Sequence, residues 1–298
     1  MLSITSDGRK DGVMYACRDY LLGVFEMLVV TMIWGSITLF AIWSGLPSPV
    51  FVFFRVLVAV PAIAAMIIVG KGVGALKVSG NKKYVIVSGV LLTLNWVFLF
   101  YAVQFTAIAN AVMLYYTGPV VAIVLSPVAL KEKVPAWVVI PVFMTVSGIF
   151  LMVLQGFSSL TIPGFIFGIL SGVAYGGLAV TSKLAAKEHE PEVVVLYQAV
   201  ISLFLLFPFA VLWNYSMNEI VALIVVVVGV VHTALALRIW YDALTRIPMR
   251  TASVLSYLDP VFATIFAYIF LAQIPSMYTI VGGMMIIVAG LMIVLKVE

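Results

Sequence analysis

The sequence predicts an all-α integral membrane protein in which ten transmembrane helices form an inverted repeat of two five-helix halves. Three observations support this prediction: an apolar composition, ten long apolar runs, and one phrase that occurs twice. Hydrophobic residues make up 64% of the 298 residues and charged residues only 9%, whereas a soluble domain has roughly 25% charged residues. A chain with so few charges cannot cover a surface in water, so its surface must face lipid.

The ten apolar runs are each close to the length of about 20 residues that a helix needs to cross the hydrocarbon core. Strands of a β-barrel would instead be about 10 residues long with alternating polarity. The connections are short, which leaves no room for a soluble domain. A polar tail, 1–19, precedes a first run that is too long for a cleavable signal peptide. The predicted helices are 20–43, 49–70, 83–104, 107–130, 135–154, 163–186, 192–213, 219–244, 250–272 and 276–296.

The positions of Lys and Arg predict the orientation of these helices. The connections on one side of a ten-helix arrangement contain no Lys or Arg. The positive-inside rule therefore places both termini in the cytoplasm, with the protein in a plasma or inner membrane. Because the charges follow the connections, the net charge of +4 does not indicate nucleic-acid binding. Fourteen of the sixteen cations lie on the opposite side: Arg9, Lys10, Arg18, Lys71, Lys77, Lys82, Lys83, Lys131, Lys133, Lys183, Lys187, Arg246, Arg250 and Lys296.

The repeated phrase is MLYYTGPV at 113–120, which returns as VLSYLDPV at 254–261. Aligning Pro119 with Pro260 also aligns the flanking helices, so five helices precede the midpoint and five follow it. Because five is odd, the second set enters the membrane from the opposite side. Inverted repeats of this kind are a recurrent transporter architecture with the substrate site near mid-membrane. The predicted repeats are 20–154 and 155–298.

Several short motifs resemble the drug/metabolite transporter superfamily, EamA type. They are WGS at 34–36, FFR at 53–55 and AIANAVMLYYTGPVVAIVLSPVALKE at 107–132. The resemblance implies the ten-helix fold of that superfamily and an exporter or exchanger of small metabolites. It implies a central cavity lined by helices 1, 3 and 4 of one half and 6, 8 and 9 of the other, with helix 2 toward the periphery. The second copy departs from the pattern, because it has Gln273 where the first has Glu132.

The two aligned prolines fall near the middle of the bilayer. A proline inside a helix lacks an N–H and breaks the bond to the carbonyl four residues earlier, here that of Tyr115 for Pro119 and of Ser256 for Pro260. A free carbonyl is tolerated at this depth only against protein or a wet cavity. The pair is therefore either a hinge that presents acceptors to substrate and lets each half rock, or a static kink that shapes packing.

Charged residues inside a bilayer are costly and need a reason. Asp259 directly precedes Pro260, and a desolvated carboxyl group there could carry a proton or pair with an arginine. Arg55, in helix 2, is expected to make a structural pair or a contact at the outer opening rather than to bind substrate. Glu26 could reach water from the end of helix 1, or take part in proton coupling.

Two charges in helix 8 are expected to pair with each other. Arg238 and Asp242 are four residues apart, so they share a helix face. Arg238 could alternatively offer its planar guanidinium to a carboxylate or phosphate. His232, central in the same helix, is either a hydrogen-bonded core residue or a group that titrates near neutral pH in the cavity.

An aromatic, hydrogen-bonding lining would suit a small amphipathic solute better than a bare ion. The aromatic residues can also pack against lipid, so only part of them is expected to contact substrate. The candidate substrate-binding residues are Trp34, Asn95, Trp96, Tyr101, Tyr115, Tyr116, Tyr175, His232, Arg238 and Tyr257. Four glycines spaced by four residues along 164–177 predict a smooth helix face that another backbone can approach closely.

The sequence gives no support for an enzyme. GKGVG at 70–74 lacks the spacing and the trailing Lys-Ser/Thr of a phosphate-binding loop, and two histidines form no metal constellation. No cofactor or metal is expected. The leading hypothesis is a secondary active or facilitative transporter of small organic metabolites, with amino acids favoured. The alternatives are nucleotide sugars, organic phosphates or cationic drugs as substrate, a lipid flippase, or a membrane scaffold that moves no solute.

Overall fold

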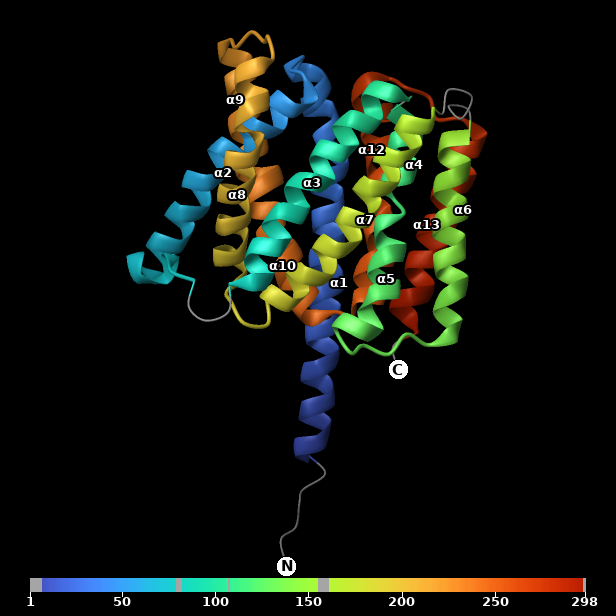
Figure 1. Ribbon diagram of the computed structural model, residues 1–298. Coiled ribbons are helices and arrows are strands. Elements are labelled where there is room, and N and C mark those ends of the chain that lie inside the picture. The colour runs from blue at the N-terminus through green and yellow to red at the C-terminus, as the bar shows by residue number, and fades with distance from the viewer. Residues whose placement is uncertain (1–6, 79–81, 107, 155–160, 297–298) are drawn as a thin grey trace, which may run out of the picture.

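The computed structural model describes residues 7–78, 82–106, 108–154 and 161–296, which form one helical bundle (Figure 1). Ten of its helical spans are long and apolar enough to cross a membrane, and the described part of the chain contains no strand. The prediction of ten transmembrane helices is therefore confirmed. The connection at 155–160 and residues 1–6 of the tail lie outside the described residues.

Seven spans are single helices and three are interrupted. The single helices are α1 (Asp7–Ser44), α2 (Ser48–Lys71), α3 (Lys83–Phe105), α6 (Val139–Val153), α7 (Ile162–Ala185), α8 (Pro191–Leu212) and α13 (Met277–Leu295). The fourth span consists of α4 (Ile108–Tyr115) and α5 (Gly118–Ala129). The eighth consists of α9 (Glu219–Val227), the π-helical η4 (Val228–Leu235) and α10 (Ala236–Arg246). The ninth consists of α11 (Met249–Ser256) and α12 (Leu258–Leu271). Short 3₁₀ turns, η1 (Val73–Leu76) and η2 (Ala136–Val138), lie in two connections.

The prolines of the repeated phrase account for two of these interruptions. Pro119 is at the start of α5 and Pro260 at the start of α12, where a missing N–H costs no helical hydrogen bond. The predicted helices 107–130 and 250–272 are thus each two shorter helices. The same break occurs at the same point of both repeats.

The ends of the fourth and ninth spans repeat each other as well. Lys131 and Ala272 are the two described non-glycine residues with positive φ, at 58° and 52°, and they lie 141 positions apart like the two prolines. After each of them the next backbone N–H returns to the end of its helix, from Glu132 to the Ser126 carbonyl and from Gln273 to the Ala267 carbonyl. This left-handed turn ends both helices in the same way.

Helix packing also follows the inverted repeat. α1 packs along α12 and α10, and the corresponding helix of the second half, α7, packs along α5 and α3. A Cβ at Gly35 of α1 would lie 2.9 Å from the carbonyl oxygen of Asp259, and one at Gly176 of α7 would lie 2.7 Å from that of Gly118. Gly35 and Gly176 are 141 positions apart, and so are Gly118 and Asp259. Each half therefore inserts its first helix against the broken helix of the other half.

The glycine face of α7 is confirmed as a surface for close packing. A Cβ at Gly168 would lie 2.6 Å from Leu114, and one at Gly172 would lie 2.7 Å from the Leu114 carbonyl and closer still to the Thr117 hydroxyl. Small residues matter here because lipid is as apolar as a leucine side chain, so helices in a membrane associate through close contact rather than through the hydrophobic effect. The glycines hold α7 against the break between α4 and α5.

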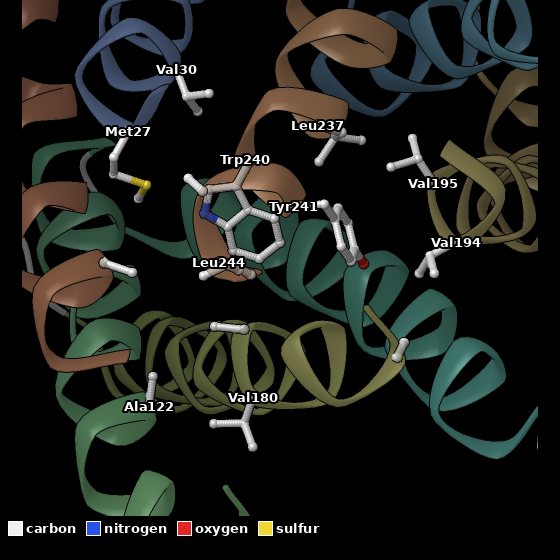
Figure 2. Packing of buried hydrophobic residues seen from close by; sticks show 14 of the residues in the cluster. Met27, Val30, Ala122, Val180, Val194, Val195, Leu237, Trp240, Tyr241 and Leu244 are labelled. Carbon is white, nitrogen blue, oxygen red and sulfur yellow. The ribbon is translucent and has the colours of Figure 1, made fainter. Parts of the chain in front are cut away.

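The largest apolar cluster lies where α1, α7, α8 and α10 meet (Figure 2). Trp240 and Tyr241 of α10 are at its centre, with ring centroids 5.3 Å apart, and 3% and 0% of their surfaces are exposed. Met27 of α1 lies on one side and Val194 of α8 on the other (Figure 2). Trp240 and Tyr241 lie toward the end of the bundle at which α1 begins and α13 ends, and the cluster continues toward the other end through Phe53 of α2 and Leu206 of α8. The end at which α1 begins has a distinct charge pattern.

That end is called the basic end below, because Lys71, Lys183 and Arg246 lie there at helix ends. The opposite end, with the connections 45–47, 213–218 and 273–276, is called the neutral end. α1 is longer than predicted and projects beyond the bundle at the basic end (Figure 1). At the neutral end α7, α9 and α13 each begin with a side-chain cap, from Thr161, Asn218 and Ser276 respectively.

Candidate functional site: a polar cavity between the repeats

A cavity of about 280 Å³ lies between the two repeats. Six spans contribute side chains to it, the first, third, fourth, sixth, eighth and ninth, as the family resemblance implied, and Arg55 of α2 joins them. His232 and Asp259 place the cavity near the middle of their spans and next to the break between α11 and α12. It is lined by Trp34, Ile37, Thr38, Arg55, Leu92, Asn95, Trp96, Leu99, Val112, Tyr115, Tyr116, Tyr175, Leu178, His232, Thr233, Leu237, Trp240, Asp259, Pro260 and Ala263.

An acidic group stands at the break of the ninth span. The hydroxyl of Tyr116 donates a hydrogen bond of 3.0 Å to Oδ2 of Asp259, and the hydroxyl of Tyr257 donates one of 2.7 Å to the carbonyl of Tyr116. Tyr116 and Tyr257 are equivalent residues of the two repeats, 141 positions apart, and their rings stack at 5.7 Å. The residue equivalent to Asp259 is Gly118, so only one repeat carries the carboxyl group at this position.

A basic group lines the same cavity. The guanidinium of Arg55 lies 4.5 Å from the centre of the Trp96 ring, a cation–π contact. Its Nε is buried without a hydrogen-bond partner among the described residues. The expected structural ion pair of Arg55 is therefore wrong for the described residues, and the alternative, a contact at the outer opening, stays a prediction. α2 packs along η4 and α8, which turns this face of α2 inward.

His232 lies in the π-helical segment η4, whose wider turn is a frequent feature of functional sites. Its Nε2 is 2.9 Å from the Ser36 hydroxyl, and its carbonyl accepts a hydrogen bond of 3.1 Å from the Trp34 indole. The hydroxyl of Thr233 bonds the carbonyl of Val228 five residues earlier, which stabilises the π geometry. His232 therefore ties η4 to α1 at the cavity wall.

Aromatic rings form much of the remaining wall. Tyr115 and Tyr175 stack at 4.9 Å with nearly parallel planes, so the fourth and sixth spans meet through a ring pair. Asn95 lines the cavity, but its amide is engaged in packing: it donates to both oxygens of Ser171, whose hydroxyl donates back to the Asn95 carbonyl. The wall thus has both apolar surface and hydrogen-bonding groups.

The cavity is closed toward the basic end. Tyr175 and Trp240 line both the cavity and a separate void of about 10 Å³ on its basic side, so these two rings divide the two spaces. Beyond them, ion pairs join the repeats. Glu132 lies 2.7 Å from Lys183 and accepts a hydrogen bond from the backbone N–H of Met249.

Further ion pairs cross between the repeats at the same end. Glu26 lies 2.8 Å from Arg246, and Lys71 lies 2.7 Å from Glu190. Glu26 therefore forms an ion pair at the basic end and does not line the cavity. Among the described residues no ion pair is found at the neutral end.

The comparison with known proteins agrees with this architecture. A model of the EamA-like transporter family matches residues 21–154 and, a second time, residues 162–295. The chain belongs to the EamA-like transporter family. It is thereby a multi-pass membrane transporter of the drug/metabolite type, which implies a small-molecule substrate and a lipid bilayer around it.

Relatives of this EamA-like transporter include bacterial and archaeal proteins. It is 26% identical to the uncharacterized transporter YxxF of Bacillus subtilis over 88% of this chain and 86% of that protein. It is 27% identical to the pseudopaline exporter CntI of Pseudomonas aeruginosa over 83% of this chain and 86% of that protein. A crystal structure that is 19% identical aligns with a TM-score of 0.81 over 90% of this chain and 95% of its own, which shows the shared fold.

Three predicted substrate-binding residues of the EamA-like transporter do not line the cavity. Tyr101 is partly exposed and stacks on Phe167 of α7. Tyr257 is buried behind Tyr116, which it supports by its hydrogen bond. Arg238 points its Nε toward Glu192 at 3.3 Å, at the basic end. The predicted pair of Arg238 with Asp242 is therefore wrong: on this helix face the carboxylate of α8 is the one within reach.

Of the two proposed hinge prolines, Pro260 lines the cavity and Pro119 lines the small void on its basic side. Both stand at helix breaks, and their role as hinges stays a prediction. Residues that sequence reasoning missed include Thr38 and Thr233. Thr38 follows Trp34 by four residues, so it shares the face of α1 on which a cavity residue had been predicted.

Proposed function

We propose that this EamA-like protein is a secondary active or facilitative transporter of small organic metabolites, and that amino acids are its substrates. The observation that carries the proposal is that the described residues lining one mid-membrane cavity include one arginine, Arg55, and one carboxylic acid, Asp259. Groups of opposite charge in one cavity complement a solute that is itself dipolar and has no net charge.

The aromatic wall supports a solute that also has an apolar part. A nucleotide sugar or organic phosphate would bring two or more negative charges to a cavity with one arginine and one carboxyl group, which disfavours that alternative. A cationic drug would lie in the same cavity as Arg55, and the repulsion between the two positive charges disfavours that alternative as well. A scaffold without solute would be expected to have a dry, closed interface between its repeats rather than a cavity lined by polar groups.

The relatives are compatible with export. CntI is described as an exporter of pseudopaline, and we infer outward movement of a metabolite by this chain on that analogy alone. The absence of Lys and Arg in the neutral-end connections supports an orientation with both termini in the cytoplasm. In that orientation the ion pairs of the basic end close the cavity on the cytoplasmic side. Asp259 is the proposed proton carrier, should transport be coupled to protons.

The experiment is counterflow in liposomes that contain the purified full-length protein. Vesicles loaded with one unlabelled amino acid are diluted into the same labelled amino acid, and the panel covers the twenty common amino acids, a nucleotide sugar and a sugar phosphate. We expect protein-dependent uptake of at least one amino acid, and no uptake of the nucleotide sugar or the sugar phosphate. Uptake of the phosphate compounds alone, or of nothing, would refute the proposal.

A further inference from the structure

We propose that Arg55, held by Trp96, is the carboxylate subsite of this transporter, so that a substrate lies with its carboxylate at α2 and its ammonium group toward Asp259. The inference rests on the proposed function and specifies how the same cavity orients its solute. It assigns binding to a residue that the sequence and the family resemblance placed outside the cavity.

Arg55 differs from four other cations of the helical spans. Lys71, Lys183 and Arg246 each have a carboxylate within 3 Å, and Arg238 has one at 3.3 Å. No carboxylate lies within 4 Å of Arg55 among the described residues. A guanidinium that has been moved away from water and has no counter-ion is costly. Inside a membrane protein such a group points to a ligand.

Trp96 fixes the plane of the guanidinium without using its donors. A ring 4.5 Å from the guanidinium carbon contacts the face of the ion, whereas all five N–H groups point outward within its plane. The edge of the fork therefore remains available to an acceptor. Since the side chain lines the cavity, a solute carboxylate can accept two parallel hydrogen bonds from it, the geometry for which arginine is best suited.

The charges around Arg55 favour a carboxylate over a phosphate. Arg55 is the one lysine or arginine among the described residues that line the cavity. Asp259 lines the same cavity, and a dianionic phosphate there would meet a carboxyl group with only one arginine to balance both. A carboxylate on a zwitterion satisfies Arg55 and brings its own ammonium group for Asp259.

The test compares an amino acid with its own α-amide, which keeps the side chain and the amine but has no carboxylate. The probes are the amino acid that the wild-type protein exchanges fastest and its α-amide, each used to compete against the labelled amino acid in counterflow. In the wild-type protein we expect the amide to compete at least about tenfold more weakly, the loss typical of one charge-assisted pair. Equal competition by acid and amide would overturn the proposal.

The residue assignment is tested by R55Q with R238Q as the matched control. R55Q is expected to bring the ratio of amide to acid potency close to one, whereas R238Q, whose guanidinium lies outside the cavity, keeps the wild-type ratio. If R55Q does not fold, R55K provides the same test, because lysine retains the charge but not the planar fork, and the ratio is expected to fall at least about threefold. W96L is expected to weaken competition by the amino acid and to leave competition by its α-amide unchanged.

The outcomes separate this inference from the proposed function. A wild-type protein that exchanges no amino acid would overturn both. A wild-type protein that exchanges amino acids while R55Q and R55K keep the full preference for acid over amide would overturn the carboxylate subsite and leave the transport function in place.

Discussion

At the scale of single residues, the ion pair between Glu132 and Lys183 is the most buried charged contact between the repeats, with 19% and 8% of the two side chains exposed. Lys183 also donates to the carbonyl of Ile247, and Glu132 accepts from the N–H of Met249. The pair thus fixes the turn between α10 and α11 against the end of α5. Because both side chains are largely buried, each charge needs the other as its counter-ion.

We expect E132Q to lower the stability of the purified protein by about 3 kcal/mol, because it leaves the buried Lys183 ammonium without its counter-ion. The measurement is the midpoint of thermal unfolding in detergent. The double variant E132Q/K183M, which removes both charges, should recover a large part of the loss.

The matched control is E190Q. Its partner Lys71 and Glu190 itself are 41% and 65% exposed, and an exposed pair contributes about 0–1 kcal/mol. An E132Q midpoint as close to wild type as that of E190Q would contradict a structural role for the buried pair.

The proposed role of Asp259 in proton coupling can be tested through the pH dependence of transport. If its carboxyl group binds and releases a proton during the cycle, D259N removes that step, and the dependence of the transport rate on pH should flatten. Counterflow measured across pH 5 to pH 8 in wild type and D259N provides the comparison. The same pH profile in both proteins would exclude Asp259 as the proton carrier.

Residue-scale prediction from sequence succeeded where the repeat supplied a reference. Asp259 could be singled out because the equivalent residue in the first repeat is Gly118, and the structure places it in the cavity. Arg55 was misplaced because nothing in the sequence shows how α2 is rotated. Its inward face depends on packing against α8 and η4, which is a property of the assembled bundle.

At the scale of elements, the two broken helices could be predicted from Pro119 and Pro260, since the chemistry of proline is local. The π-helical η4 could not. Its sequence, VGVVHTAL, carries no residue that forces a wider turn. The turn is supported by contacts from other helices, such as the close approach of Gly229 to Val58 and the hydrogen bond from Trp34.

Two glycines of α7, Gly172 and Gly177, give an element-scale prediction. At Gly172 an added methyl group would collide with the Thr117 hydroxyl and the backbone of α4, so G172A should destabilise the protein by about 1–3 kcal/mol. At Gly177 the nearest atom would be the tip of Leu91 at 3.2 Å, which can move. G177A should therefore be neutral, or stabilising by up to about 1 kcal/mol through helix propensity.

Thermal unfolding of both variants checks this difference. Since both exchange a glycine for alanine in one helix, propensity is matched and only the neighbouring surface differs. A G172A protein as stable as G177A would show that α7 does not depend on close contact with the break between α4 and α5.

At the scale of the whole molecule, the two ends of the bundle are not equivalent although the repeats are. The turns that end the fourth and ninth spans have the same geometry, but Glu132 reaches the other repeat at the basic end, whereas its counterpart Gln273 is exposed at the neutral end. The departure of Gln273 from the family pattern thus has a structural consequence. Among the residues that the structure describes, ion pairs between the repeats stabilise closure only at the basic end.

The whole-molecule architecture was the part best predicted from sequence. Ten runs of sufficient length, the distribution of cations and the offset of 141 between the prolines determine the number and inverted order of the helices. The cavity itself depends on side chains from seven spans, so its membership could be predicted only in part. The substrate is even harder to predict from the sequence, because its identity depends on where a few charged groups lie in the cavity wall.

The most direct test of the central claim, that solute passes through the cavity between the repeats, is amino-acid counterflow in A263W. Ala263 lines the cavity, and an indole there would fill it. V128W is the control, because Val128 is 86% exposed on the outer surface of α5. We expect A263W to lose exchange and V128W to retain the wild-type rate, with both proteins folded. Exchange by A263W at the wild-type rate would contradict the central claim.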